Sequence, residues 1–555
     1  MPVNAAIFYN PDGYDTTRPA LMGRHAAGEA FLKAYVQHGE ADPLYCYARS
    51  KAHYQDFDRR VEEIAFGRAS EWIQFTQLKD LAKPGCVYLP GPGLNDSAWQ
   101  RRFVDQRAYS LCGVTHTTAT QRVMDRLGDM LLAPVQSWDA LICTSQVVKS
   151  SIEQVLGEYA QYLAARVGAR PKLAVQLPVI PLGVDSAAFA TPEEAGEIRR
   201  KFRDRYKLAD DDIVVLFMGR LNFHAKANPL GMYVALERAA RRSGKRLVLV
   251  LSGWFGGDAS KNAFFSGAKQ LCPSVRFIHV DGRKPEARKY IWHVADIFTS
   301  LSDNVQETFG LTPLEGMAAG LPVVVSDWNG YRDTVRPGID GIMVPTAMPA
   351  AGQGRDLALR QYLEVDEYES YVGKAAMCTA VDVEAAAEAY GALATDANLR
   401  RRMGEAGRKR AREQFDWSKI IPVYHALWQE LAERRTKDGE LAPRRGSAPM
   451  YALRADPFRA FACYPSHIMG PETQIELAPG AGMADFARIK GLRIAQHGRD
   501  LFATEQSCQR LIKLVEERGG LTMAQLMEVA PAAEKPRLQR TVGWLAKMGV
   551  FRLRG

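Results

Sequence analysis

The sequence predicts an α/β protein in which two doubly wound domains face each other across a cleft and a small, mostly helical domain follows. Short apolar runs alternate with amphipathic helical stretches, and this β-α-β rhythm predicts parallel sheets with helices on both faces. Residues 179–185 interrupt the rhythm, because Pro181 and Gly183 beside a short apolar run are typical of a hinge. The 555 residues are enough for about three or four domains.

The apolar runs form one set on each side of the hinge. Before it, we expect strands at residues 5–9, 44–47, 87–89, 111–114 and 140–143. After it, we expect strands at residues 213–218, 247–251, 275–280, 297–300, 322–326 and 342–345. Ligands of open α/β sheets bind outside the carboxyl ends of the strands, so the cleft is the expected site.

Composition and charge narrow the class of protein. Hydrophobic residues make up 47% and charged residues 24%, as in ordinary globular proteins. The eight cysteines form no CxxC pair, and neither a signal peptide nor a membrane-spanning stretch is evident, so we expect reduced thiols and a cytoplasmic location. The net charge of +9 suits nucleotide phosphates, an acidic membrane surface or nucleic acid.

Residues 307–326 carry the most informative motif, ETFGLTPLEGMAAGLPVVVS. It predicts a loop, a tight turn at Phe309-Gly310, a helix over residues 311–319 and a buried strand. The backbone N–H groups of Gly310, Leu311 and Thr312 would then lie at a helix N-terminus, which is a favourable site for a phosphate.

Two glutamates flank this turn. Glu315 lies one turn inside the predicted helix, where it could accept hydrogen bonds from a sugar diol, and Glu307 lies in the loop ahead. Either glutamate alone would be interpreted as a solvated residue at a helix end. The full motif resembles the E-x7-E signature of retaining glycosyltransferases of the GT-B fold, particularly glycosyltransferase family 4. The family pattern is roughly E-G-F-G-L-x-x-L-E-A-M-A-x-G-x-P-V-V, and this sequence departs from it at Thr308 and Gly316.

A second motif supplies positive charge. Gly219 and Arg220 end a predicted strand and Lys226 follows six residues later, like the G-R-L…K element of the family. The resemblance implies that Arg220 and Lys226 neutralise a departing diphosphate, that Glu315 holds the ribose hydroxyls and that Glu307 holds the donor sugar. It also implies contacts from the backbone at Phe309 and the residues that follow. We expect no metal or other cofactor beside the sugar nucleotide, because no DxD-like pair lies in a suitable loop.

The first half matches the family less closely. His116 follows a strand, and the resemblance implies that it touches the transferred sugar. Gly23 opens the first long helix and resembles the family's first glycine-containing loop, although the usual double glycine is absent. Residues 139–145 and 181–185 also fit family landmarks. Residues 415–417 resemble the element before a last helix that crosses back to the first domain.

The expected organisation is therefore a GT-B pair of Rossmann-like domains with an appendage. The domains are an acceptor domain at 1–185, a nucleotide-sugar domain at 186–415, a crossing helix at 416–435, a linker at 436–450 and an appendage at 451–555. Residues 347–379 form an insertion to which the sequence assigns no role.

The appendage has a pattern of its own. Expected helices at residues 505–518, 523–529 and 535–548 resemble a winged-helix unit. The third helix carries a set of basic side chains that could face phosphates, namely Lys535, Arg537, Arg540 and Lys547. We favour the alternative of a protein-docking or self-association module over nucleic-acid binding, because no dense basic run is present.

Together these features predict a retaining glycosyltransferase of the hexosyltransferase type. It would move a sugar from a nucleotide diphosphate sugar to a glycan, a lipid-linked or another hydroxyl acceptor, with peripheral contact at the inner membrane face as an option. One alternative is a catalytically weak protein that binds a nucleotide or glycan. The other is a nucleic-acid-binding regulator that acts through the appendage.

Overall fold

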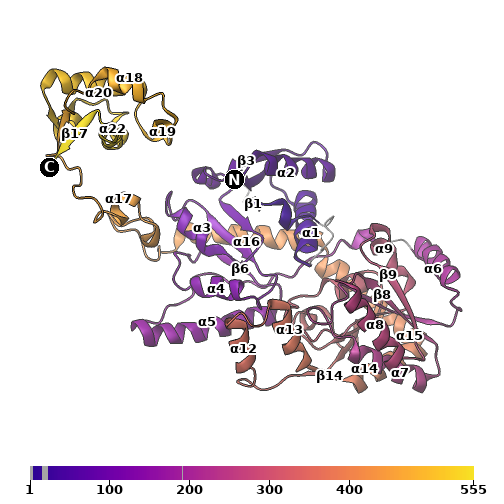
Figure 1. Ribbon diagram of the computed structural model, residues 1–555. Coiled ribbons are helices and arrows are strands. Elements are labelled where there is room, and N and C mark those ends of the chain that lie inside the picture. The colour runs from indigo at the N-terminus through magenta and orange to yellow at the C-terminus, as the bar shows by residue number, and fades with distance from the viewer. Residues whose placement is uncertain (1–3, 16–22, 190–191) are drawn as a thin grey trace. The chain divides into compact units, whose positions relative to one another are not determined.

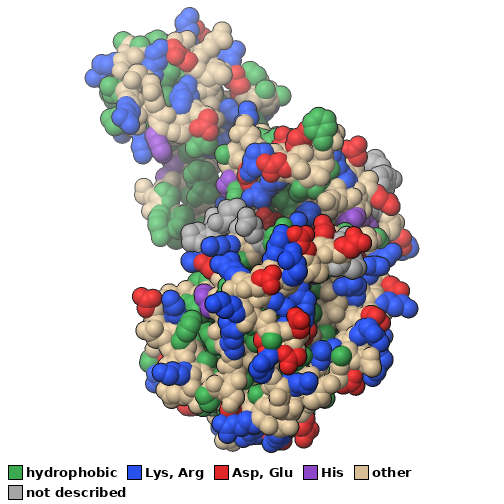
Figure 2. Space-filling view, turned by 90° about the vertical axis from the view of Figure 1, so that its right-hand side faces the viewer, with side chains coloured by type: hydrophobic (Ala, Val, Ile, Leu, Met, Phe, Trp, Pro, Cys, Tyr) green, Lys and Arg blue, Asp and Glu red, His purple; other side chains and the backbone are tan. Residues whose placement is uncertain are grey.

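The computed structural model describes residues 4–15, 23–189 and 192–555. The chain divides into two compact units, Met1–Gly446 and Ser447–Gly555 (Figure 1). Lys and Arg side chains intermix with Asp and Glu side chains over the face shown in Figure 2.

The first domain is built on a six-stranded parallel sheet. Its strand order is β3-β2-β1-β4-β5-β6. The strands are β1 (Ala6–Tyr9), β2 (Leu44–Ala48), β3 (Ser70–Gln74), β4 (Cys86–Leu89), β5 (Ser110–Val114) and β6 (Ala140–Ile142). The sequence predicted five of them and missed β3, an edge strand whose residues Ser70, Glu71 and Gln74 keep it partly exposed. The helices are α1 (Gly23–His38), α2 (Lys51–Ile64), α3 (Leu94–Arg101), α4 (Gln121–Asp129) and α5 (Gln146–Val167).

The second domain repeats this topology. Its sheet has the order β12-β11-β10-β7-β8-β9 and all its pairings are parallel. The strands are β7 (Ile213–Met218), β8 (Leu247–Gly253), β9 (Arg276–Asp281), β10 (Ile297–Ser300), β11 (Val323–Ser326) and β12 (Gly341–Val344). The sequence predicted all six, and the two sheets confirm the predicted fold class. In both sheets the order reverses beside the first strand, where doubly wound folds place their ligands.

Helices cover both faces of the second sheet (Figure 1). They are α6 (Pro192–Tyr206), α7 (Leu230–Ser243), α8 (Asp258–Leu271), α9 (Pro285–Tyr290), α10 (Leu311–Ala318), α11 (Tyr331–Thr334), α14 (Val383–Thr395) and α15 (Ala397–Arg410). The residues between β12 and α14 carry α12 (Arg355–Tyr362) and α13 (Tyr368–Met377), joined at their base by the short strands β13 (Thr346–Ala347) and β14 (Ala380–Val381).

A long helix, α16 (Trp417–Lys437), follows the second domain and packs into the core of the first. The ring of Tyr424 lies 5.1 Å from that of Phe31, and the ring of Trp428 lies 5.7 Å from that of Tyr35. Burial of these aromatic side chains stabilises the return of the chain by roughly 1.5–3 kcal/mol per side chain.

The hinge runs beside the start of α16. The N–H of Val184 donates to the carbonyl of Phe415 at 2.8 Å, and the N–H of Trp417 donates to the carbonyl of Val184 at 3.1 Å. Gly183 is required here, because an added Cβ would lie 2.4 Å from the Trp417 ring. The two connections between the domains are thus hydrogen-bonded to each other.

The second unit contains a three-stranded antiparallel sheet of order β16-β15-β17, formed by β15 (Gln474–Leu477), β16 (Leu521–Thr522) and β17 (Phe551–Arg554). Its helices are α17 (Pro457–Ala460), α18 (Met483–Ile489), α19 (Arg493–Gln496), α20 (Glu505–Arg518), α21 (Met523–Val529) and α22 (Lys535–Lys547). The last three match the predicted helices to within one residue. Its winged-helix character and its role stay predictions. Among the described residues, no helix has both the length and the apolar character that a bilayer crossing needs.

Candidate active site

The predicted site lies where two neighbouring strands of the second sheet end. β7 and β10 pair in parallel, so the residues that follow them meet at one edge of the sheet. Gly219, Arg220 and Lys226 follow β7, whereas Asp303 and Glu307 follow β10. Gly219 has a φ of 156°, which favours glycine as the chain leaves β7.

Lys226 and Glu307 form an ion pair at this junction. The Nζ of Lys226 lies 2.6 Å from Oε2 of Glu307, and the two side chains are 27% and 10% exposed. Burial acts to raise the pKa of Glu307, but the Lys226 ammonium and the N–H groups of Thr308 and Phe309 outweigh it, so its pKa is lowered. Glu307 is therefore an ionised hydrogen-bond acceptor near neutral pH. We expected the N–H of Phe309 to contact the phosphate. In the structure it donates a hydrogen bond to the Glu307 carboxylate instead.

The turn after Glu307 forms as predicted. Gly310 has a φ of 87° and begins α10, and an added Cβ would lie 2.0 Å from the ring of Tyr331. Gly310 occupies the N-cap position and has no side-chain oxygen. It therefore caps none of the first N–H groups of α10, which include those of Leu311 and Thr312. The start of α10 thus has the features of an anion site.

The remaining glutamate and the two departures from the family pattern also lie here. Glu315 is half-buried within α10. Gly316 faces β10, where an added Cβ would lie 3.0 Å from Phe298, so glycine replaces the usual alanine for close packing. Thr308 replaces the usual glycine, and its hydroxyl donates to the carbonyl of His116 at 3.0 Å.

That bond joins the two domains beside Glu307. His116 follows β5 of the first domain and is half-buried. The hydroxyl of Ser145 donates to the carbonyl of Thr308 at 2.9 Å, and the N–H of Gln146 donates to the carboxylate of Asp333 at 2.6 Å. The structure therefore places the backbone of His116 in contact with Thr308, the residue that directly follows Glu307.

Arg220 lies in a different environment from the one expected for a phosphate-binding residue. Its Nη1 lies 2.8 Å from Oε1 of Glu369, and its Nη2 donates to the carbonyl of Ala225 at 3.2 Å. Glu369 lies in the first turn of α13, within the segment to which the sequence assigned no role.

Two further landmarks belong to the first domain. Gly23 begins α1, and the residues just before it, 16–22, lie outside the described residues. Asp139 is fully buried, and both of its oxygens accept hydrogen bonds from Arg101, at 2.6 and 2.7 Å. It also accepts N–H bonds from Leu111 and Gln136, so its position is explained by the packing of β5 and β6.

Asp303 is a residue that sequence reasoning missed. It is buried, and its carboxylate accepts a long bond, of 3.4 Å, from the N–H of Asn228. Burial raises its pKa to about 7. Its place directly after a buried strand, at the carboxyl edge of the sheet, is the signal that could have identified it. Asn329, whose side chain donates to the carbonyl of Glu307, was missed as well.

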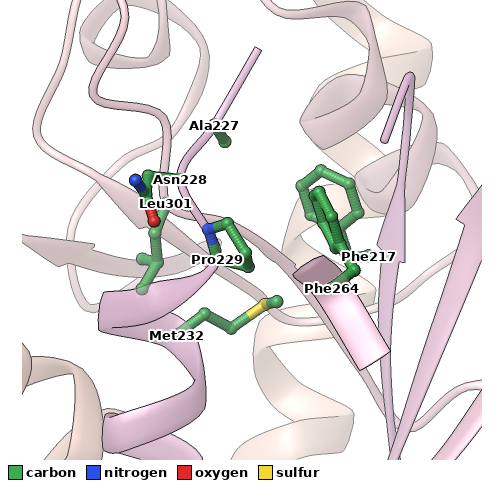
Figure 3. A pocket seen from close by; sticks show the side chains of 7 residues that line it. All are labelled: Phe217, Ala227, Asn228, Pro229, Met232, Phe264 and Leu301. Carbon is green, nitrogen blue, oxygen red and sulfur yellow. The ribbon is translucent and has the colours of Figure 1, made fainter. Parts of the chain in front are cut away.

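A small apolar pocket is lined in part by residues 227–229, which directly follow Lys226 (Figure 3). It is lined by Phe217, Ala227, Asn228, Pro229, Met232, Phe264 and Leu301. Its lining offers carbon atoms almost throughout, so we interpret it as a packing space that supports the loop. Within the described part of the chain, no three His, Cys, Asp or Glu side chains cluster as metal ligands would.

A family model supports the interpretation of this edge. The model described as Glycosyl transferases group 1 matches residues 198–376, which include Arg220, Lys226, Glu307 and Glu315. This segment is therefore similar to the group 1 glycosyltransferases. The match confirms the resemblance drawn from the 307–326 motif.

Curated relatives agree with this assignment. A D-inositol 3-phosphate glycosyltransferase of Actinosynnema mirum is 34% identical over 171 residues, which are 30% of this chain and 39% of that protein. An uncharacterized glycosyltransferase of Methanocaldococcus jannaschii is 29% identical over 185 residues, 32% of this chain and 45% of that protein. A D-inositol 3-phosphate glycosyltransferase of Kribbella flavida is 27% identical over 339 residues, 59% and 68% of the two chains. The chain thus spans less than half the length of the first two.

Solved structures similar to the chain include two proteins of known architecture. HepE of Anabaena, in complex with UDP and glucose, gives a TM-score of 0.48 at 14% identity and covers 77% of this chain and 100% of its own. A sucrose-phosphate synthase from Thermosynechococcus elongatus gives 0.44 at 17% identity, covering 77% and 99%.

We predict that Asp303→Asn removes a pH dependence of stability. Because the folded pKa of Asp303 is about 7, the folded state holds a proton that the unfolded state releases near pH 4, the ordinary value. The contribution of Asp303 to the unfolding free energy therefore falls as pH rises from about 4 to 7 and is constant above pH 7. Asparagine stays neutral and keeps an acceptor for the N–H of Asn228. The variant should therefore melt at least ~2 °C higher than the native protein at pH 8 and at the same temperature as the native protein at pH 4.

Thermal melts between pH 4 and pH 8 test this, with the exposed Asp210→Asn as the matched control. A constant offset between native protein and Asp303→Asn over the whole range would contradict a raised pKa at Asp303.

Proposed function

We propose that this chain is a retaining glycosyltransferase that moves a sugar from a nucleotide diphosphate sugar to a hydroxyl acceptor. The observation that carries the proposal is the Lys226–Glu307 ion pair, which lies beside the start of α10 within the group 1 segment. A diphosphate placed there would meet the N–H groups of α10 and the ammonium of Lys226 together.

The donor would bind mainly to the second domain. Lys226 and Arg220 would neutralise the diphosphate as its bond to the sugar breaks. Preorganised charges of this kind typically lower the activation free energy by on the order of 3 kcal/mol each. Glu307, ionised because its pKa is lowered, would accept hydrogen bonds from hydroxyls of the donor sugar. Glu315 would hold the ribose hydroxyls.

The acceptor hydroxyl would attack the anomeric carbon from the side that the diphosphate leaves. The departing phosphate oxygen then takes the proton of the attacking hydroxyl, so no enzyme base is needed on the opposite face. His116, whose carbonyl is fixed by Thr308, would position the sugar. The names of the relatives point to a small phosphorylated polyol as one class of acceptor to test.

Lys226→Ala and Arg220→Ala should each reduce kcat by about 100-fold while weakening donor binding far less, because the diphosphate gains charge as it leaves. A thermal-shift screen of UDP-, GDP- and ADP-sugars identifies the donor, and kinetics with calorimetry then separate kcat from donor affinity. The exposed Lys245→Ala is the matched control. Losses of equal size in donor affinity and in kcat/KM would instead show uniform binding.

The product of an α-linked donor should keep the α configuration, as proton NMR of the new linkage would show. His116→Ala should slow transfer without changing the anomer, because in this mechanism His116 only positions the sugar. A β-linked product would show that an enzyme base acts from the far face, with His116 as the nearest candidate.

A further inference from the structure

The helix pair α12–α13 reaches the loop that carries the predicted diphosphate ligands. Glu369, in the first turn of α13, contacts this loop with both oxygens. Oε1 lies 2.8 Å from Nη1 of Arg220, and Oε2 accepts a hydrogen bond of 3.2 Å from the side chain of Asn222. Arg220 is only 19% exposed, whereas Glu369 is 50% exposed.

Packing fixes the position of α13 over the loop. Val372 is fully buried against Ala225 and Ala119, and Gly373 lies so close to His224 that an added Cβ would be 3.1 Å from its backbone. Glu369 lies three and four residues before Val372 and Gly373, on the same face of α13, so its contact with Arg220 follows from that packing.

Hydrogen bonds within the helix pair hold α12 and α13 together. The carboxylate of Asp366 accepts bonds from Arg360 at 2.8 Å and from Lys374 at 2.5 Å. Both bonds favour the ionised carboxylate, and the pKa of Asp366 lies well below its ordinary value. The pair therefore acts as one element.

The same element also contacts the first domain. The hydroxyls of Tyr368 and Thr117 are 3.5 Å apart, and the side chain of Gln121 donates to the carbonyl of Gln361 at 2.7 Å. Thr117 directly follows His116, the predicted sugar-binding residue. Glu369 thus lies on an element that contacts both domains beside the site.

We propose that Glu369 is a positioning residue that holds Arg220 and competes with the donor diphosphate for it. A carboxylate and a phosphate both bind guanidinium N–H groups, and both are anions, so a bound diphosphate competes with Glu369 for Arg220. Release of Glu369 to water costs little because its side chain is half exposed. The inference rests on the proposed function and adds a residue that tunes diphosphate affinity and product release.

The test uses the full-length protein and Glu369→Gln, which keeps the side-chain shape and removes the charge. UDP, GDP and ADP are titrated by calorimetry, together with uridine, guanosine and adenosine. The diphosphate that binds should bind Glu369→Gln about three- to tenfold more tightly, because a competing anion near the guanidinium is gone. The matching nucleoside should bind both proteins equally.

Two controls separate this role from a structural one. Glu367→Gln removes an exposed carboxylate two residues away and should leave the affinity unchanged. In an Arg220→Ala background, Glu369→Gln should have no effect, because the competition is for Arg220. Glu369→Ala should shift the affinity in the same direction as Glu369→Gln.

Unchanged or weaker diphosphate binding by both Glu369 variants, with native melting behaviour, would overturn the inference while leaving the proposed function intact. An affinity gain that persists without Arg220 would also overturn it. If none of the three diphosphates binds either the native protein or Glu369→Gln, the proposed function fails and the inference fails with it.

Discussion

The ion pair between Lys226 and Glu307 is the interaction on which the rest of the site depends. It requires the loops after β7 and β10 to meet, and the strand order of the second sheet brings them together. Gly310 lets the chain turn from Glu307 directly into α10, where Tyr331 leaves no room for a Cβ. Because Lys226 keeps the buried Glu307 ionised, a carboxylate, an ammonium and a helix N-terminus lie together where the two loops meet.

Most of the fold could be predicted from the sequence, because most strands are buried on both faces and appear as apolar runs. The strands missed include β3 and β15, which lie partly exposed and carry polar residues, so their apolar signal is weak. Others, such as β13 and β14, are only two residues long. Glu307 and Gly310 could be found because a loop, a turn and a helix follow one another within a few residues. The partner of Arg220 could not, because Glu369 lies 149 positions away and only tertiary packing brings the two together.

The departures from the family pattern have local physical reasons. Thr308 replaces a glycine and gains a hydrogen bond to the first domain, and Gly316 replaces an alanine where β10 carries Phe298. The helix pair α12–α13 adds an element that contacts Arg220 on one side and the residues after His116 on the other. Specific features of this chain thus gather at the junction between its two Rossmann-like domains.

A crystal structure of the full chain with a bound nucleoside diphosphate tests the central claim most directly. We expect the β-phosphate within hydrogen-bond distance of the Lys226 ammonium and the first N–H groups of α10, with the ribose hydroxyls at Glu315. A diphosphate bound elsewhere, with the Lys226–Glu307 pair unchanged and the start of α10 occupied only by water, would contradict it.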